Sequence, residues 1–142
     1  MSATKRDADA RIPGYFDSPF PGEDGGPRRQ MIGRGAALDA CGSGTAAATW
    51  RAVAMANMVV LRAPGEVFLQ GSSPPGADTT AWVERIDPHT LEAIVRSPDL
   101  PGGPWWPGGI LAHENGDLYV THGRWCHRLS PDLRIVAARE LP

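Results

Sequence analysis

The sequence predicts an all-β protein in which two four-stranded antiparallel meanders follow an irregular N-terminal arm. The first observation is an internal repeat, since residues 58–101 can be laid over residues 109–142 with two gaps. The second is that both copies contain a glycine and an acidic residue followed by an apolar–aromatic–apolar run, which begins at Gly65 and at Gly116. Repetition at this period indicates a recurring supersecondary unit, and short apolar runs between turn residues indicate strands.

The N-terminal arm is expected to span residues 1–45. This stretch holds eight of the 17 glycines and four of the 14 prolines, and its apolar residues follow no sustained period. Such a composition favours turns and irregular chain over regular structure. We expect the arm to be disordered or draped over a domain formed by residues 46–142.

Residues 45–61, which lead into the first repeat, allow two interpretations. Six alanines between residues 46 and 56 favour a helix. The apolar run from Met58 to Leu61 instead favours a buried strand. We expect a short helical or extended lead-in that ends at Ala54, followed by a strand at residues 57–62.

Eight strands are expected in the two repeats, and turn residues mark the boundaries between them. Asp87-Pro88 favours a turn, because proline fixes φ and the aspartate accepts hydrogen bonds from the following amides. Asn115-Gly116 between apolar runs favours a tight hairpin. The expected strands are residues 57–62, 66–71, 81–87 and 91–96 in the first repeat and residues 109–113, 117–122, 125–129 and 133–139 in the second.

The repeat resembles a β-propeller blade. The segments GEVFLQ…WVERIDPHTLEAIV and GDLYVTHGRWCHRLSPDLRIVAARELP are similar to blades with NHL, six-bladed lactonase-like or quinoprotein-like repeats. The resemblance covers residues 57–142 and implies one blade at 57–101 and a second at 109–142. Propellers close with about four to eight blades, so two blades imply a fragment or truncated member of a propeller, or a unit that self-associates. The resemblance assigns no catalytic residue to this sequence.

Composition excludes some classes of partner. The net charge is −2, and the 14 Lys and Arg residues form no run that would follow a phosphate backbone, so we expect neither nucleic acid nor a membrane surface as a partner. The N-terminus lacks the apolar core of a signal peptide. We therefore expect a soluble protein, cytoplasmic by default. Cys41 and Cys126 are expected to be free thiols, although a disulfide between them stays open.

Four residues form the expected ligand-binding site: Trp105, Trp106, His122 and Arg124. In a propeller-like meander, the connection between blades (residues 101–108) emerges on the same face as the turn beside His122 and Arg124. Paired tryptophans there are suited to stack on a sugar or an aromatic ring, with polar side chains as anchors. The alternative is that both tryptophans fill the gap between neighbouring blades as part of the core.

No metal site and no cofactor are expected. The candidate metal ligands match no zinc-binding spacing; they are His113, His122, Cys126 and His127. His113 and His122 are expected at opposite ends of a strand pair, about 17 Å apart at the rise of a strand. Cys126 and His127 alternate between the two faces of their strand. Acidic residues in and near the turns are expected to be solvated rather than catalytic; they are Glu84, Asp87, Glu114 and Asp117.

The expected function is that of a binding or interaction module of unknown specificity. It would associate with itself or with missing blades through open blade faces, and a small-molecule ligand would also suit this scaffold. The alternative is part of a propeller enzyme, a lactonase-like hydrolase or a quinoprotein-like oxidoreductase, with its site on the face of Trp105 and His122. Two blades supply only part of the ring of side chains that such an enzyme uses, so the sequence favours a non-enzymatic role for this chain alone.

Overall fold

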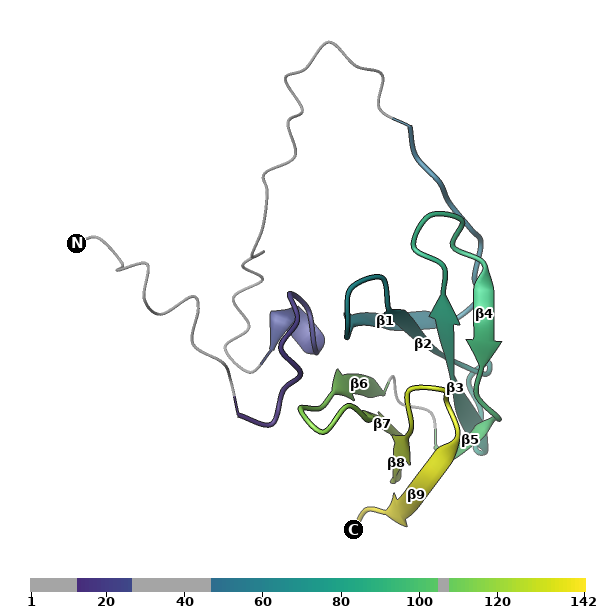
Figure 1. Ribbon diagram of the computed structural model, residues 1–142. Helices are drawn as coiled ribbons and strands as arrows, with labels where there is room; N and C mark the ends of the chain where they lie inside the picture. Colours follow the sequence, from purple (N-terminus) through teal and green to yellow (C-terminus); the bar gives the residue numbers. More distant parts are fainter. Residues whose placement is uncertain (1–12, 27–46, 105–107) are drawn as a thin grey trace, which may run out of the picture.

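The computed structural model of the chain describes residues 13–26, 47–104 and 108–142 (Figure 1). These residues contain nine strands and one short 3₁₀ turn, η1 (Glu23–Gly25). The strands are β1 (Ala56–Leu61), β2 (Val67–Ser72), β3 (Thr79–Ile86), β4 (Ala93–Arg96), β5 (Leu100–Gly103), β6 (Gly109–Ala112), β7 (Leu118–His122), β8 (Trp125–Leu129) and β9 (Ile135–Glu140). Residues 1–12 and 27–46 of the expected arm lie outside the described residues.

The strands form two antiparallel sheets. The first has the order β1-β2-β3-β4, with β5 paired to the start of β3, and the second has the order β6-β7-β8-β9. From β1 to β4 and from β6 to β9, each strand lies beside the next one in the chain, which confirms the all-β fold with two four-stranded antiparallel meanders. Predicted and observed strand ends differ by two residues at most, and the strand expected at residues 125–129 is β8.

β5 lies where the sequence predicts a connection beginning at residue 101. Its residues are Leu-Pro-Gly-Gly, and proline and glycine are poor strand formers. The strand forms because β3 offers it a partner, with Ala81 opposite Leu100 and Thr80 opposite Pro101. The missing N–H of Pro101 is tolerated because the segment lies at the edge of the sheet.

The lead-in to β1 contains no helix within its described part, residues 47–55. A helix of this length is marginal on propensity alone, and contacts with the first sheet hold the chain in an irregular path. The Arg51 guanidinium lies 2.5 Å from the Glu84 carboxylate, and Val53 packs on a small apolar cluster around Trp82. These contacts outweigh the preference of the alanines for helix.

The two sheets pack face to face around one hydrophobic core. Side chains alternate along each strand, so every second residue enters the space between the sheets. The first sheet contributes Val60, Phe68, Ala81, Val83 and Leu100, and the second contributes Ile110, Ala112, Leu118, Val120 and Leu129, all no more than 3% exposed. Burial of each large apolar side chain is worth about 1.5–3 kcal/mol. In Figure 1, β1 and β6 begin the two sheets and lie next to each other.

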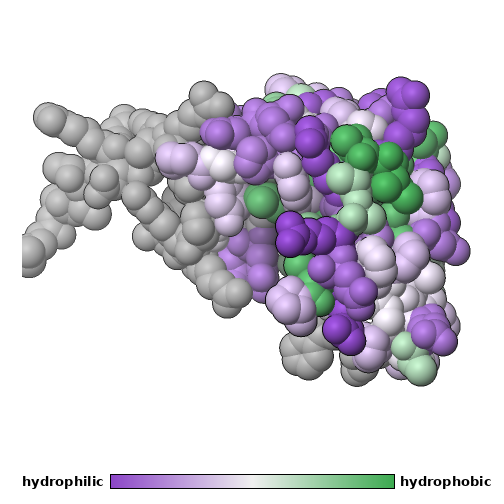
Figure 2. Space-filling model, turned by 90° about the horizontal axis from the view of Figure 1, so that it is seen from below, coloured by the Kyte–Doolittle hydropathy of each residue, from purple (hydrophilic) through white to green (hydrophobic). Residues whose placement is uncertain are grey.

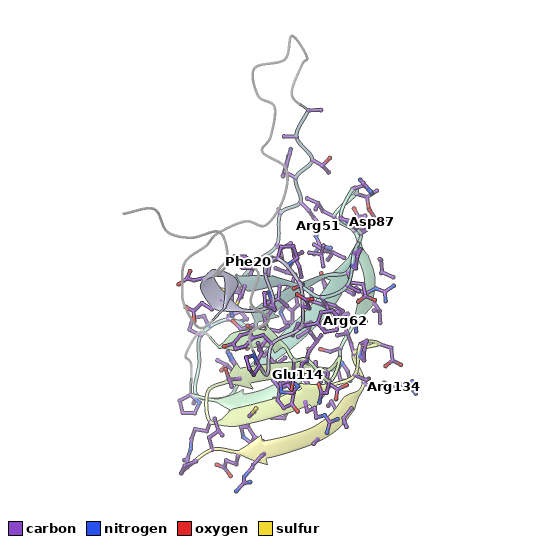
Figure 3. All side chains as sticks on the ribbon, turned by 60° about the vertical axis from the view of Figure 1, so that its left-hand side comes forward. Phe20, Arg51, Arg62, Asp87, Glu114 and Arg134 are labelled. Carbon is purple, nitrogen blue, oxygen red and sulfur yellow. The ribbon has the colours of Figure 1, made fainter. Side chains whose placement is uncertain are left out.

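Residues 13–26, hereafter the strap, bind the inner edges of both sheets. The amide of Phe16 donates to the Ala112 carbonyl of β6, and the amide of Leu61 in β1 donates to the Phe20 carbonyl. The Ser18 hydroxyl adds a second bond to the Leu61 carbonyl. Figure 3 shows Phe20 beside the helical turn of the strap. The strap thus fastens the two sheets to each other at one end of the core.

No helix within the described residues is long and apolar enough to cross a membrane.

Candidate functional site

The core between the sheets ends in a group of buried polar side chains, hereafter the polar cluster. Its members are no more than 3% exposed and are Gln70, Ser72, Thr79, His122 and His127. Strand alternation explains their burial: on β2, Gln70 and Ser72 continue the inward row that begins with Phe68, and on β7, His122 continues the row of Leu118 and Val120. The interface is therefore apolar at the strap end and polar at the other.

Hydrogen bonds across the interface fix the tautomers of both histidines. Thr79 donates its one hydroxyl proton to the Gly103 carbonyl, 2.7 Å away, so its oxygen accepts from His122 Nε2 at 2.9 Å. His127 Nε2 donates to the Pro101 carbonyl at 2.7 Å. In the neutral rings both Nδ1 atoms are therefore acceptors.

Several acceptors of the polar cluster have no partner among the described residues. They include the Nδ1 atoms of both histidines, the Gln70 Oε1 atom and the Ser72 hydroxyl. In the Gln70 side chain, the amide nitrogen does have a partner, because it donates to the Thr121 carbonyl at 3.4 Å. Unpartnered buried polar groups are costly, so these four atoms set the polar end of the interface apart from the apolar end.

Burial favours the neutral form of the His122 imidazole. Loss of water around the ring lowers the pKa of His122, and the neighbouring His127 lowers it further. The His127 ring in turn stacks on Trp125, with 6.0 Å between centroids and 18° between planes. A second proton on the His122 ring would lie in the interface with no acceptor among the described residues for Nδ1–H.

Three glycines close the polar end of the interface. A side chain at Gly102 would overlap the His122 ring, and one at Gly108 would overlap the Thr121 carbonyl. At Gly123, which has φ 55°, a side chain would overlap the Gly102 carbonyl. The turn between β7 and β8 therefore packs directly on the backbone of β5, where Gly102 also accepts the amide of Arg124.

Of the expected ligand-binding residues, the described part of the chain includes His122 and Arg124, whose side chains lie in different environments. The His122 side chain is 1% exposed and belongs to the polar cluster. The Arg124 side chain is 60% exposed and lies 3.7 Å from the Glu140 carboxylate. Trp105 and Trp106 lie outside the described residues.

The candidate metal ligands are distributed over the second sheet. His113 lies at the strap end, where it pairs with Tyr15 and its ring contacts Tyr119. Cys126 is partly buried, which raises the pKa of its thiol. In the described ranges, no three His, Cys, Asp or Glu side chains are placed to hold a metal ion.

Structural contacts account for the carboxylates of Asp87, Asp117 and Glu84. The Asp87 carboxylate accepts the amides of His89 and Thr90 at 2.8 and 2.9 Å, which lowers its pKa and confirms the turn predicted there (Figure 3). Asp117 binds Arg128 across β7 and β8 at 2.5 Å. Glu84 binds Arg51, as described above.

Sequence reasoning missed Thr79 and Pro101 as the partners of the histidines, and it missed the buried Gln70 beside them. Strand alternation alone could have placed His122 on the inward face, because it follows Leu118 and Val120 at two-residue spacing. Its contact with Thr79 depends on how the two sheets are set against each other, and no local pattern encodes that.

Comparisons of the chain with protein-family models, with curated proteins and with solved structures found no match.

Proposed function

We propose that the chain is a β-propeller-type scaffold that acts as a binding or interaction module. The observation that carries this proposal is the face-to-face packing of two consecutive four-stranded meanders through one shared core. Consecutive blades of a propeller pack in this way, with each blade contacting only its neighbours. The repeated sequence pattern of residues 58–101 and 109–142 supports the same relation.

The outer face of the first sheet supports association with further blades. This face carries a second apolar cluster of Leu69, Trp82 and Ile86, separate from the core between the sheets. Val53, Val67 and Leu91 pack against this cluster and leave it 7–8% exposed, so the open part of the face lies beside it. Val59 lies opposite Leu69 on the same face and is 39% exposed. Figure 2, a view of the molecule from below, shows hydrophobic residues that gather at the right with hydrophilic residues around them. In a repeat protein, open apolar faces are where the next repeat packs.

The occupant that we propose is a second copy of the chain, and its test is the mass in solution. Sedimentation velocity over a range of concentrations is expected to give species heavier than the 15.2 kDa chain. Val59→Asp, which places a charge on the open face, is expected to shift the distribution to the single chain. Ile135→Asp is the matched control, because Ile135 is similarly exposed at 45% but lies on the outer strand β9. A single-chain mass at every concentration would contradict the proposal.

We do not propose the enzymatic alternative. It places its site on the face of Trp105 and His122; Trp105 lies outside the described residues, and His122 is buried and bonded to Thr79. The described residues give this alternative no support.

A further inference from the structure

A pocket of about 310 Å³ lies between the strap, β1 and the second sheet. We call it the strap pocket. Aromatic and apolar side chains form much of its wall, chiefly Tyr15 of the strap, Met58 of β1, and Leu111 and Tyr119 of the second sheet. Its size falls at the lower end of the range of small-molecule sites, and its lining is of the kind that such sites have.

The strap pocket also includes part of the inner edge of β6. Both backbone groups of Ala112 point to this edge, because its carbonyl accepts from Phe16 at 2.8 Å and its amide donates to Pro21 at 2.7 Å. Orientation alternates along an antiparallel strand, so the N–H and C=O of Ile110, two residues earlier, point to the same edge. Ile110 lines the pocket. The pocket therefore presents one backbone donor and one backbone acceptor side by side.

This combination defines the chemistry of a ligand. A flat ring would lie against the rings of Tyr15 and Tyr119, because aromatic rings favour offset or edge-to-face contacts. A group with an adjacent donor and acceptor would bond the N–H and C=O of Ile110, as a neighbouring strand would do. A carboxamide or a lactam on an aromatic ring meets both requirements, and being neutral it brings no negative charge close to Glu23, which also lines the pocket.

We propose that the strap pocket binds a planar aromatic carboxamide or lactam through the edge of β6 at Ile110. The site needs only the strap, β1, β6 and β7. It therefore stands apart from the relation to propellers and from self-association through the outer sheet face.

The test is a titration of the full-length chain with benzamide, followed by the backbone amide signals in NMR spectra. A ligand of this size binds weakly, so the titration extends to about 10 mM. The expected result is saturable shifts at Ile110 and in the strap. N,N-dimethylbenzamide has no N–H to donate, and we expect it to bind about tenfold more weakly, since one hydrogen bond is lost.

A filled pocket supplies the second arm of the test. Thr121 lines the pocket and is exposed on β7, where an aromatic residue suits a strand. Thr121→Trp is expected to abolish benzamide binding, whereas Val136→Trp, at a position 51% exposed on β9, is expected to leave it unchanged. The proposal is overturned if the unsubstituted chain shows no saturable shift, or if the two benzamides bind equally. Both results are obtained without any variant.

Discussion

Replacement of Gly123 by alanine is expected to destabilise the protein by roughly 2–5 kcal/mol, for two separable reasons. The residue has φ 55°, in the left-handed region, where a Cβ costs about 1–2 kcal/mol. The new methyl group would also overlap the Gly102 carbonyl of β5. Forcing extra atoms into a packed site costs about 1–3 kcal/mol. The sum is large because neither backbone can withdraw without opening the polar cluster.

Two other glycines isolate these contributions. Gly65 has φ 77°, and no atom lies within 4 Å of the place that an alanine methyl group would take, so Gly65→Ala is expected to cost only the conformational part, about 1–2 kcal/mol. Gly102 has no positive φ, but a methyl group there would overlap the His122 ring. Gly102→Ala is therefore expected to cost only the steric part, about 1–3 kcal/mol.

The assay is urea unfolding of the three variants and the unsubstituted chain, followed by tryptophan fluorescence. Trp82, at 8% exposed, is a suitable reporter of unfolding. The three free energies are comparable if the dependence on urea is the same for all four proteins. If Gly123→Ala is no more destabilising than Gly65→Ala, the close packing of the β7–β8 turn on β5 is wrong.

Two further predictions concern the two ends of the interface. Because the pKa of His122 in the folded chain is lowered from 6.5, the unfolded chain binds a proton at this residue more readily. His122 therefore lowers the free energy of unfolding as the pH falls below 6.5. Above that pH the residue is neutral in both states and has no such effect. Urea unfolding midpoints measured at several pH values should fall with pH below 6.5, and His122→Gln should reduce this pH dependence. An equal pH dependence in the variant would argue against the role of His122. At the other end, Ser18→Ala removes the bond to the Leu61 carbonyl and is expected to cost about 0.5–1.5 kcal/mol. It should also speed hydrogen exchange at the Leu61 amide, and unchanged exchange there would show that the strap does not depend on this contact.

Strands and turns could be predicted where local chemistry decides them. At the hairpin of Asn115-Gly116, the glycine has φ 91° and the asparagine side chain accepts the amide of Asp117 at 3.0 Å. These are the properties for which those residue types are favoured in turns. β5 could not be predicted in this way, because its proline and glycines form a strand only through pairing with β3.

The candidate site was less accessible to sequence reasoning than the strands. Periodicity assigns His122 and His127 to strands, but it does not state which acceptors face them from the other sheet. Those acceptors come from Thr79 and Pro101, and Pro101 lies in the strand that the sequence does not indicate. The polar cluster is therefore defined by how the two sheets pack, and the sequence of each strand alone does not predict it.

The polar cluster and the strap together explain how two sheets hold one relative position. Apolar contacts have little directionality, so an apolar core alone does not define how far one sheet is shifted along the other. Directional bonds occur at both ends of this core. The strap joins β1 and β6 through Leu61 and Ala112, and the histidines of β7 and β8 bond to β3 and β5 at the opposite end. Sliding one sheet along the other would break both sets at once, so the pair behaves as one unit whose outer faces are left for other contacts.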